Sequence, residues 1–424
     1  LDTVIAKIDG KKVLGIGSPR ASLESNFALR ELVGQANFST GMSQKEQNLV
    51  ELAASIMQTE GVYNPGMREI ESYDAVLILG EDLTQTAPRM ALSVRQAAKN
   101  KAKEMAAEKR TQEWLAEPVQ RIAQDAKSPI YILAATQTRL SDVAAGEVVA
   151  SPNDIARLGF AIAAAVKGDA IVGLDDDAKA FAQTIADTLK AAKKPLVISG
   201  TSLQDASIME AAAQVAQNLG NAGLTLTVPE VNSMGLAIFG GNSLEQAFAQ
   251  DYDAVIVVEN DLYRRLPAKQ VDAALAKAKD VIVLDHSETE TVKKATIVLS
   301  AASFAEGDGT VVSQEGRAQR FYQVYDPSYY KPELAIKESW RWLHALETGV
   351  KGKAISWTVL DDVIETVAKN VPALEAIQDV APDAGFRVHG LKVAREPRRY
   401  SGRTSMRAPL SIHEPKQPTD KDSA

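Results

Sequence analysis

The side chains that could do chemistry in this sequence are oxygen and nitrogen donors, because none of its 424 residues is a cysteine. Cysteine thiolates act as nucleophiles and bind iron–sulfur clusters and many zinc ions. The sequence therefore excludes disulfide bonds, thiolate catalysis and cysteine-bound metals within this chain. The four histidines lie far apart, without metal-binding spacing: His286, His344, His389 and His413. His286 follows a predicted strand and could line a cleft, but a hydrogen-bonded loop histidine is the simpler interpretation.

Two short segments have the composition of a ligand site. Residues 15–20, Gly-Ile-Gly-Ser-Pro-Arg, follow a predicted strand in the manner of a dinucleotide-binding loop. However, Arg20 stands where that fingerprint needs glycine or alanine, and no acidic residue follows a second strand about twenty positions later. The run of Asp175, Asp176 and Asp177 would suit a cation, yet acidic residues are common at helix starts, where they interact favourably with the helix dipole. We predict no bound nicotinamide, flavin or metal ion.

An eleven-residue pattern occurs twice, at residues 73–83 and 252–262. Each copy is an apolar run that leads to a proline, Pro88 or Pro267, at the same offset of 179 residues (252 − 73 and 267 − 88). An apolar run bounded by turn residues is typical of a parallel strand buried on both faces. Residues 193–200 repeat residues 11–18 in a similar way. We expect the two repeat strands to lie in separate parallel sheets, at matching positions.

The remaining elements follow from capping residues and periodicity. Ser18 and Pro19 predict the start of a helix that runs to about Leu32. Ser43 and Glu46 have the spacing of a capping box, which opens a helix to about residue 59. The alanine-rich segment after the first repeat predicts a long charged helical stretch to about residue 127. Residues 231–242 and the segment after residue 301 are predicted as loops.

The overall composition is that of a soluble globular protein, with 45% apolar and 24% charged residues. The length predicts two or three domains. A net charge of −8 argues against a general nucleic-acid or anionic-membrane binder. No apolar run approaches the roughly 20 residues that span a bilayer, and we expect no direct membrane insertion.

Three segments together resemble the molybdopterin oxidoreductase superfamily. Residues 304–321 are similar to its E-x-x-G-T-x-x-N-x-E-G-R-x-Q loop, residues 15–32 to its G-S-x-R…E-x-N unit, and residues 231–235 to its N-x-x-G loop. The resemblance implies an α/β fold of two Rossmann-like doubly wound lobes, one inserted in the other. It places the first lobe at residues 1–40 plus 232–330 and the inserted lobe at 41–231. A helical segment at 331–380 and an irregular basic tail at 381–424 follow.

Within this superfamily the chain resembles the large peripheral subunit family of the bacterial NADH-quinone oxidoreductases (respiratory complex I). Residues 15–22, 304–320, 338–344 and 395–403 carry this similarity. It implies a structural, redox-inert part of the peripheral arm of a proton-translocating enzyme, not catalytic by itself, at the cytoplasmic face of the inner membrane. The expected partners are the other peripheral-arm subunits and an iron–sulfur domain of the same subunit. That domain, with its cysteine-bound clusters, would lie in a missing N-terminal part, and no cofactor is expected in this fragment.

The resemblance also indicates which residues to examine. In catalytic relatives a serine, cysteine or selenocysteine after the first strand–helix unit coordinates the metal. Ser39 and Ser43 occupy that region here, but Ser43 is better explained as a helix cap, and we assign no catalytic, cofactor-binding or metal-binding residue. The family loop is expected to close the gap between the lobes through six structural residues: Glu306, Gly309, Thr310, Glu315, Gly316 and Arg317.

Seven cations and a single acid lie between residues 387 and 407 of this otherwise acidic chain. Proline and glycine nearby predict an extended segment. A solvated tail is one interpretation, and nucleic acid is a weaker one. We favour docking onto carboxylates of the lobes or of a neighbouring subunit, because the arginine fork forms bidentate bonds. The interface candidates are Arg395, Arg398, Arg399, Tyr400 and Arg403.

Two other functions stay open on the sequence alone. One is an active molybdopterin-dependent oxidoreductase, which metal analysis would reveal. The other is a free-standing nucleotide-binding module, which would show a ligand-induced shift in melting temperature.

Overall fold

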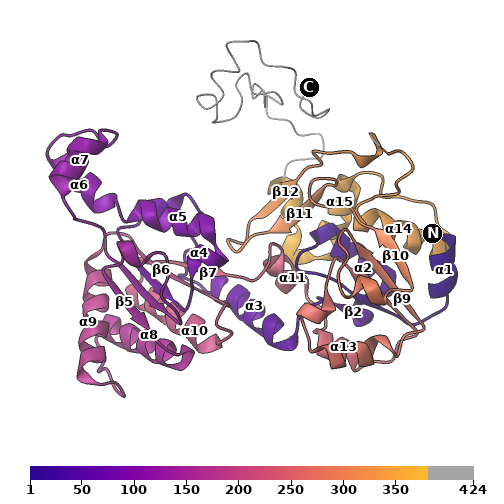
Figure 1. The fold of residues 1–424 in the computed structure, drawn as a ribbon, viewed down its shortest axis with the longest axis horizontal. Helices are drawn as coiled ribbons and strands as arrows, with labels where there is room; N and C mark the ends of the chain where they lie inside the picture. Colours follow the sequence, from indigo (N-terminus) through magenta and orange to yellow (C-terminus); the bar gives the residue numbers. More distant parts are fainter. Residues whose placement is uncertain (330, 381–424) are drawn as a thin grey trace, which may run out of the picture. The chain divides into compact units, whose positions relative to one another are not determined.

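The computed structural model describes residues 1–329 and 331–380, so the basic tail and its interface candidates lie outside the described residues. The described elements form two five-stranded parallel sheets and one antiparallel pair of strands (Figure 1). Both sheets belong to one compact unit, residues 1–382. This arrangement confirms the predicted α/β class with two doubly wound sheets.

The first sheet is built from segments far apart in the sequence. In spatial order its strands are β10 (Ile297–Ser300), β9 (Asp280–Asp285), β8 (Ala254–Val258), β1 (Val13–Ile16) and β2 (Phe38–Ser39). All of its pairings are parallel. The order of strands along the chain reverses between β8 and β1. We call this sheet with its covering helices the first lobe.

The second sheet has the same layout but comes from one continuous stretch of chain. In spatial order its strands are β5 (Gly146–Val149), β4 (Ile130–Ala134), β3 (Ala75–Leu79), β6 (Pro195–Gly200) and β7 (Gly223–Thr227). Its pairings are also parallel, and the order reverses between β3 and β6. This sheet with its helices is the second lobe.

The two repeat strands occupy the same position in the two sheets. β3 and β8 are each the third strand, and β6 and β1, which carry the second repeated pattern, are each the fourth. Alternate side chains of β3 enter different cores: Leu77 and Leu79 face one side of the sheet, Val76 and Ile78 the other. The prediction of matching strands buried on both faces is confirmed.

The helices of the second lobe are α4 (Leu83–Thr86), α5 (Pro88–Ala97), α6 (Asn100–Glu108), α7 (Ala116–Ala123), α8 (Pro152–Lys167), α9 (Asp176–Ala191) and α10 (Ala206–Leu219). Four of them, α4, α8, α9 and α10, begin at a residue whose side chain caps them. The Asp175 side chain accepts a hydrogen bond from Ala178 N and caps α9. This geometry confirms that the acidic run marks a helix start.

The prediction of one long charged helical stretch after the first repeat was wrong. Residues 88–123 form three helices: a turn at Ala98 and Lys99, still with right-handed angles, separates α5 from α6, and a longer break follows α6. Arg110 ends α6 with φ = +56°, a left-handed angle that no helix interior accommodates. Figure 1 shows α6 and α7 extending away from α5 and the second sheet.

The first lobe is covered by helices from both ends of the described chain. They are α1 (Asp2–Ile8), α2 (Leu23–Val33), α11 (Ser233–Phe239), α12 (Leu244–Phe248), α13 (Ala268–Leu275), α14 (Ser339–Lys351), α15 (Leu360–Asn370) and α16 (Ile377–Val380). Helix α3 (Gln44–Met57) contacts α10 of the second lobe and α11 of the first. A single core joins Phe27 of α2, Ile256 of β8 and Trp340 of α14.

Three boundary predictions were wrong. Helix α2 is capped by Ser22 rather than Ser18, whose hydroxyl instead donates to the Glu259 carbonyl at 2.8 Å. The predicted loop at residues 231–242 contains α11. The segment after residue 301 is not wholly irregular, since β11 (Gly309–Val312) and β12 (Ala318–Phe321) pair as an antiparallel hairpin.

Candidate functional site

Ligands of doubly wound sheets bind at the carboxyl ends of the strands, where the strand order reverses. In this chain those points lie after β8 and β1 in the first lobe, and after β3 and β6 in the second. Each has a cavity beside it. Their residues decide what chemistry the chain can perform.

The turn after β8 holds a buried acid in an unusual backbone conformation. Glu259 has φ = +47°, and its repeat equivalent after β3, Gly80, has φ = +79°. The Glu259 carboxylate accepts a hydrogen bond of 2.6 Å from the Ser339 hydroxyl. The pKa of Glu259 is raised to about 7, chiefly by burial and also by nearby Asp285. The hydrogen bond from Ser339 and the charge of Arg20 act in the opposite direction. A glutamate with a left-handed backbone angle is strained, and the surrounding contacts hold Glu259 in that conformation.

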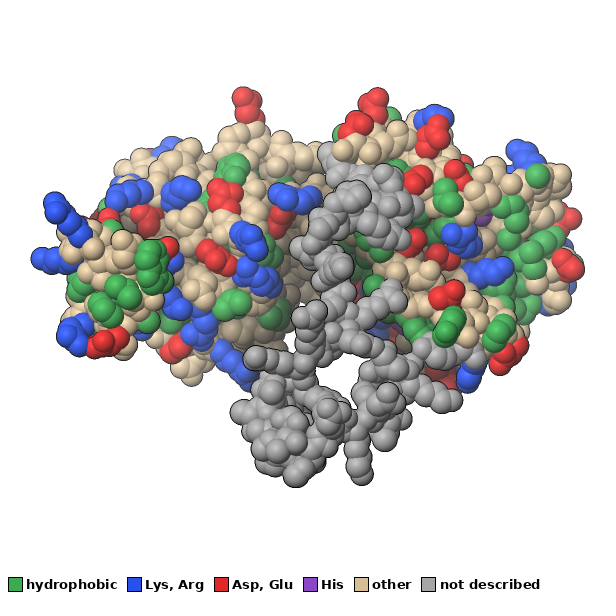
Figure 2. Space-filling view, turned by 90° about the horizontal axis from the view of Figure 1, so that it is seen from above, with side chains coloured by type: hydrophobic (Ala, Val, Ile, Leu, Met, Phe, Trp, Pro, Cys, Tyr) green, Lys and Arg blue, Asp and Glu red, His purple; other side chains and the backbone are tan. Residues whose placement is uncertain are grey.

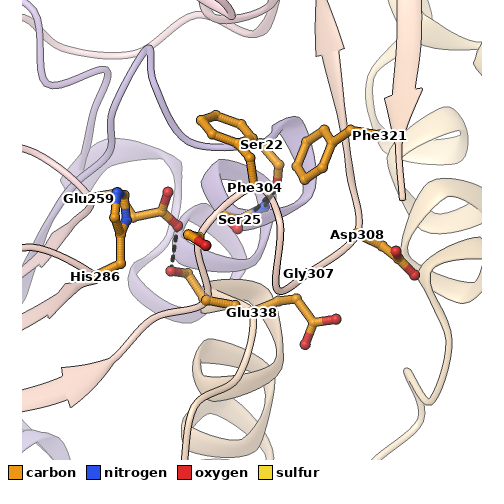
Figure 3. A pocket seen from close by; sticks show the side chains of 12 residues that line it. Ser22, Ser25, Glu259, His286, Phe304, Gly307, Asp308, Phe321 and Glu338 are labelled. Carbon is orange, nitrogen blue, oxygen red and sulfur yellow. Dashed lines mark hydrogen bonds between the residues drawn. The ribbon is translucent and has the colours of Figure 1, made fainter. Parts of the chain in front are cut away.

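The cavity next to Glu259 is small. Its volume is about 20 Å³, enough for roughly one water molecule. Figure 3 shows Glu259, His286, Glu338 and Phe321 around it. His286 therefore lines a cavity, as the sequence had allowed, and its backbone N–H donates to Asp285 at 2.8 Å.

The family loop forms one wall of this cavity and packs closely against α2. A side chain in place of Gly309 would overlap Phe321 and Ser22, with a Cβ 2.5 Å from the Phe321 ring. Thr310 N donates to the buried Glu24 carboxylate at 2.9 Å. Burial raises the pKa of Glu24, and its hydrogen bonds with Thr310 oppose that shift. The β11 strand is thus held by backbone contacts that need glycine at position 309.

The tip of the hairpin reaches the second lobe. Glu315 accepts a hydrogen bond from Met67 N at 2.9 Å, and Asn64 donates to the Gln314 carbonyl at 3.1 Å. Gly316 makes the turn with φ = +70°. These contacts support the expectation that the loop closes the gap between the lobes.

The other two loop residues lie at the edges of this contact. Arg317 is mostly exposed, with Nε 3.6 Å from the Glu315 carboxylate. Glu306 accepts from Ser303 N at 2.9 Å and stabilises the chain before the hairpin. Neither of these two side chains lines a described cavity.

The second cavity, of about 480 Å³, is large enough for a small ligand but is bordered by an ion-pair cluster. Arg265 donates to Glu46 at 3.1 Å and to Glu230 at 2.6 Å, and its side chain is only 10% exposed. Its Nε donates to Asn260 at 3.1 Å. Burial raises the pKa of Glu46, Arg265 lowers it, and Glu230 raises it. Each of the three guanidinium nitrogens of Arg265 thus donates to a protein acceptor, and Arg264 lines the same cavity.

A third buried acid lies at the edge of the second sheet. Glu81 accepts hydrogen bonds from Ser202 N and the Thr86 hydroxyl, each at 3.0 Å. Burial raises its pKa, and these bonds oppose the shift. Because Ser202 and Thr86 both line the 480 Å³ cavity, this acid lies against its wall.

The two cavities differ in what they offer a molybdopterin cofactor: the one beside Glu259 has room for about one water molecule, whereas Arg264, Arg265 and Glu46 all line the larger one. Ser39 is fully buried in β2 and accepts a hydrogen bond from Gly41 N at 3.2 Å. Ser43 accepts from Glu46 N at 3.3 Å as the cap of α3, so only half of the predicted capping box forms, and Glu46 turns to Arg265 instead. Among the described residues, no group of three or more acidic or imidazole side chains could hold a metal.

Two further sequence candidates are structural. His344 lies on α14, where its Nε2 accepts hydrogen bonds from Ser356 N and Trp357 N at 3.0 and 3.1 Å. Burial lowers its pKa, which favours the neutral ring that these bonds require. Trp340 is fully buried on the same helix and belongs to the core of the first lobe. His389 and His413 lie outside the described residues.

Sequence reasoning missed Glu259, Glu81 and Arg265 as buried charged groups. The repeat itself held a signal, since Glu259 aligns with Gly80 at the position after the central strand. A glutamate where the equivalent turn uses glycine is a reason to look for special contacts.

The doubly wound sheets and the hairpin between them place the chain in a known class. The sequence profile of the molybdopterin oxidoreductase family matches residues 1–346, and the chain belongs to this family. It is 53% identical to a subunit of the NADH-quinone oxidoreductase of Pseudomonas putida, over all of this chain and 48% of that protein. It is 52% identical to the corresponding subunit in Escherichia coli K12, over 97% of this chain and 47% of that protein. The chain thus spans about half the length of these curated relatives.

Two solved structures share the fold at low sequence identity. The formyltransferase/hydrolase complex of Methylorubrum extorquens matches with a TM-score of 0.54 and 14% identity, over 84% of this chain and 96% of that chain. Acetylene hydratase from Pelobacter acetylenicus matches with a TM-score of 0.53 and 12% identity, over 89% of this chain and 61% of that chain. These similarities concern the fold alone.

The buried acid Glu259 makes folding stability depend on pH. Because its pKa is raised from 4.5 to about 7, the folded protein holds a proton that the unfolded chain releases. Each unit of pKa corresponds to about 1.4 kcal/mol, so stability falls by up to roughly 3 kcal/mol as the pH rises from below 4.5 to above 7. Glu259→Gln should remove this part of the pH dependence. Denaturant unfolding at pH 5 and pH 8 checks it, and parallel profiles for the two proteins would contradict it.

Proposed function

We propose that this chain is a structural, redox-inert part of the peripheral arm of an NADH-quinone oxidoreductase. The observation that carries the proposal is the 53% identity over the whole chain to a subunit of such an enzyme. At both sheet edges, where a cofactor would bind, buried carboxylates are paired with groups of the protein, which supports a redox-inert role. On this proposal the chain holds no cofactor, and iron–sulfur clusters belong to a cysteine-bearing part of the full-length subunit.

The proposal includes its partners and location. The chain supports the iron–sulfur domain of the same subunit and contacts other peripheral-arm subunits at the cytoplasmic face of the inner membrane. In the described part of the chain no helix is long and apolar enough to cross a membrane. Arg395, Arg398, Arg399, Tyr400 and Arg403 remain proposed interface residues.

The lobe boundaries are also proposed rather than observed directly. Residues 1–40 plus 232–330 would form the first lobe and 41–231 the inserted one, followed by the helical segment 331–380 and the tail 381–424. The strand membership of the two sheets supports this division, because all strands of the second sheet fall between Ala75 and Thr227. The hairpin contact of Glu315 with Met67 would then be a contact between lobes.

A scaffold role predicts that damage to this part changes the amount of enzyme, not its turnover. The full-length subunit carrying Arg265→Met should give less assembled complex in the membrane, because the ion-pair cluster of α3 is lost. NADH-quinone activity per assembled complex should be unchanged. Native gels with quantitative subunit staining, combined with activity per complex, test this. A normal amount of complex with reduced turnover would mean that the chain takes part in catalysis.

A further inference from the structure

The arm formed by α6, α7 and the loop between them presents an exposed aromatic anchor. Trp114 in this loop is 73% exposed and Leu115 beside it is 43% exposed. Tryptophan and arginine are enriched among the residues that anchor protein interfaces. Figure 1 shows that the arm extends away from the second sheet, which leaves the loop accessible.

The same loop carries an arginine in a position that normally needs glycine. α6 ends in a Schellman motif, in which Arg110 N donates to the Ala107 carbonyl at 2.8 Å and Thr111 N to the Ala106 carbonyl at 2.9 Å. Arg110 adopts a left-handed backbone angle, φ = +56°, and glycine is the residue most often found at this position of the motif. Arg110 is therefore unfavourable for the fold of the helix end, and its side chain must serve another purpose.

The cations beside Trp114 are available to a partner. Lys109 and Arg110 are exposed, and neither side chain forms a hydrogen bond or ion pair with the described residues. Other basic residues of the arm are engaged: Lys101 with Glu104, Lys103 with Glu113, and Arg121 with Glu117. Figure 2 shows Lys and Arg side chains together with hydrophobic ones at the left end, where the arm lies. Together with the exposed Glu108, the two unpaired cations leave one net positive charge at the tip, in a chain of net charge −8.

We propose that the arm, residues 100–123, is a docking element for a partner protein that has an apolar pocket bordered by carboxylates. Trp114 and Leu115 would enter the pocket, and Lys109 and Arg110 would pair with the acidic rim. Repulsion between chains that each carry a charge of −8 disfavours a second copy of this chain.

The test uses the full-length protein in the cell that makes it, with the photoreactive residue benzoylphenylalanine at position 114. Irradiation should yield one product joined to a different polypeptide, and peptide mapping should place the link in an apolar pocket next to Asp or Glu. Lys109→Glu combined with Arg110→Glu should reduce the yield at least fivefold, and converting the mapped carboxylates to lysine should restore it. Benzoylphenylalanine at position 172 is the control, since Val172 is 82% exposed but lies near the acidic run at Asp175.

A second variant separates docking from folding. Arg110→Gly should lower the cross-linking yield several-fold while the melting temperature stays equal or rises, because glycine suits the left-handed position. Absence of a product, a link to lipid, a link only to a second copy of this chain, or a yield insensitive to charge reversal would each overturn the proposal.

Discussion

Replacing Arg265 with methionine should lower the free energy of unfolding by about 4 kcal/mol at pH 7. The change leaves Glu46 and Glu230 facing each other with side chains only 18% and 22% exposed and no cation between them. Removing one partner of a buried ion pair typically costs about 3–5 kcal/mol, because the remaining charge is desolvated and unpaired. Methionine keeps a similar unbranched stem, so loss of packing contributes little. Denaturant unfolding followed by tryptophan fluorescence measures the effect.

The sign of the pH effect and a matched variant identify the cause. Burial already raises the pKa of Glu46 and Arg265 lowers it, so losing Arg265 raises that pKa further. A carboxyl whose folded pKa is raised destabilises the fold above its unfolded pKa, and the defect should shrink as the pH falls from 7 towards 4.5. Adding Glu46→Gln and Glu230→Gln should restore most of the loss at pH 7. A defect that is equal at pH 5 and pH 7, or that the triple variant does not relieve, would mean that packing is the cause.

Gly41→Ala should destabilise the chain by more than about 3 kcal/mol, which is a large effect for a single methyl group. A Cβ at this position would lie 1.9 Å from the Gly17 carbonyl oxygen and 2.3 Å from the Asn260 amide nitrogen. Asn260 also donates to the carbonyls of Gly17 and Gly41 at 2.8 and 3.0 Å, which fastens the two loops together. Gly41 belongs to residues 38–43, where catalytic relatives place a metal ligand. The prediction therefore tests whether contacts within the protein leave no free space at this loop.

Gly61→Ala is the matched control for the close approach. Gly61 has a similar left-handed angle, φ = +84° against +76° for Gly41, but no atom lies within 4 Å of its would-be Cβ. Gly61→Ala should lower the free energy of unfolding only by the cost of a left-handed backbone angle in a residue with a Cβ, about 1–2 kcal/mol. Thermal and denaturant unfolding of both variants gives the difference. Equal losses would mean that the loop at Gly41 has room and is open.

The strand framework was predictable from sequence because its signal is local and repeated. Each central strand is an apolar run between turn residues, and the offset between Pro88 and Pro267 marks equivalent positions. The hairpin at residues 309–321 was predicted only as a loop, since glycine and charged residues hide its alternation. Its folding depends on partners distant in sequence, such as Glu24 and Asn232, which accept hydrogen bonds from Thr310 N and Val312 N.

The pairing of buried charged groups at the two sheet edges could not be predicted from sequence. Arg265 meets Glu46 across more than two hundred residues, and Glu259 meets Ser339 across eighty. No local pattern encodes such pairs, because they form only when segments distant in the sequence have folded together. The shift of the α2 cap from Ser18 to Ser22 has the same origin, since Ser18 is taken by the Glu259 carbonyl.

Metal and pterin analysis of the purified full-length protein tests the central claim most directly. If this part is a redox-inert scaffold, molybdenum and tungsten should be far below one atom per chain, and denaturation should release no fluorescent pterin. Iron would be found only through cysteines outside this cysteine-free chain. Stoichiometric molybdenum or tungsten together with released pterin would contradict the scaffold role.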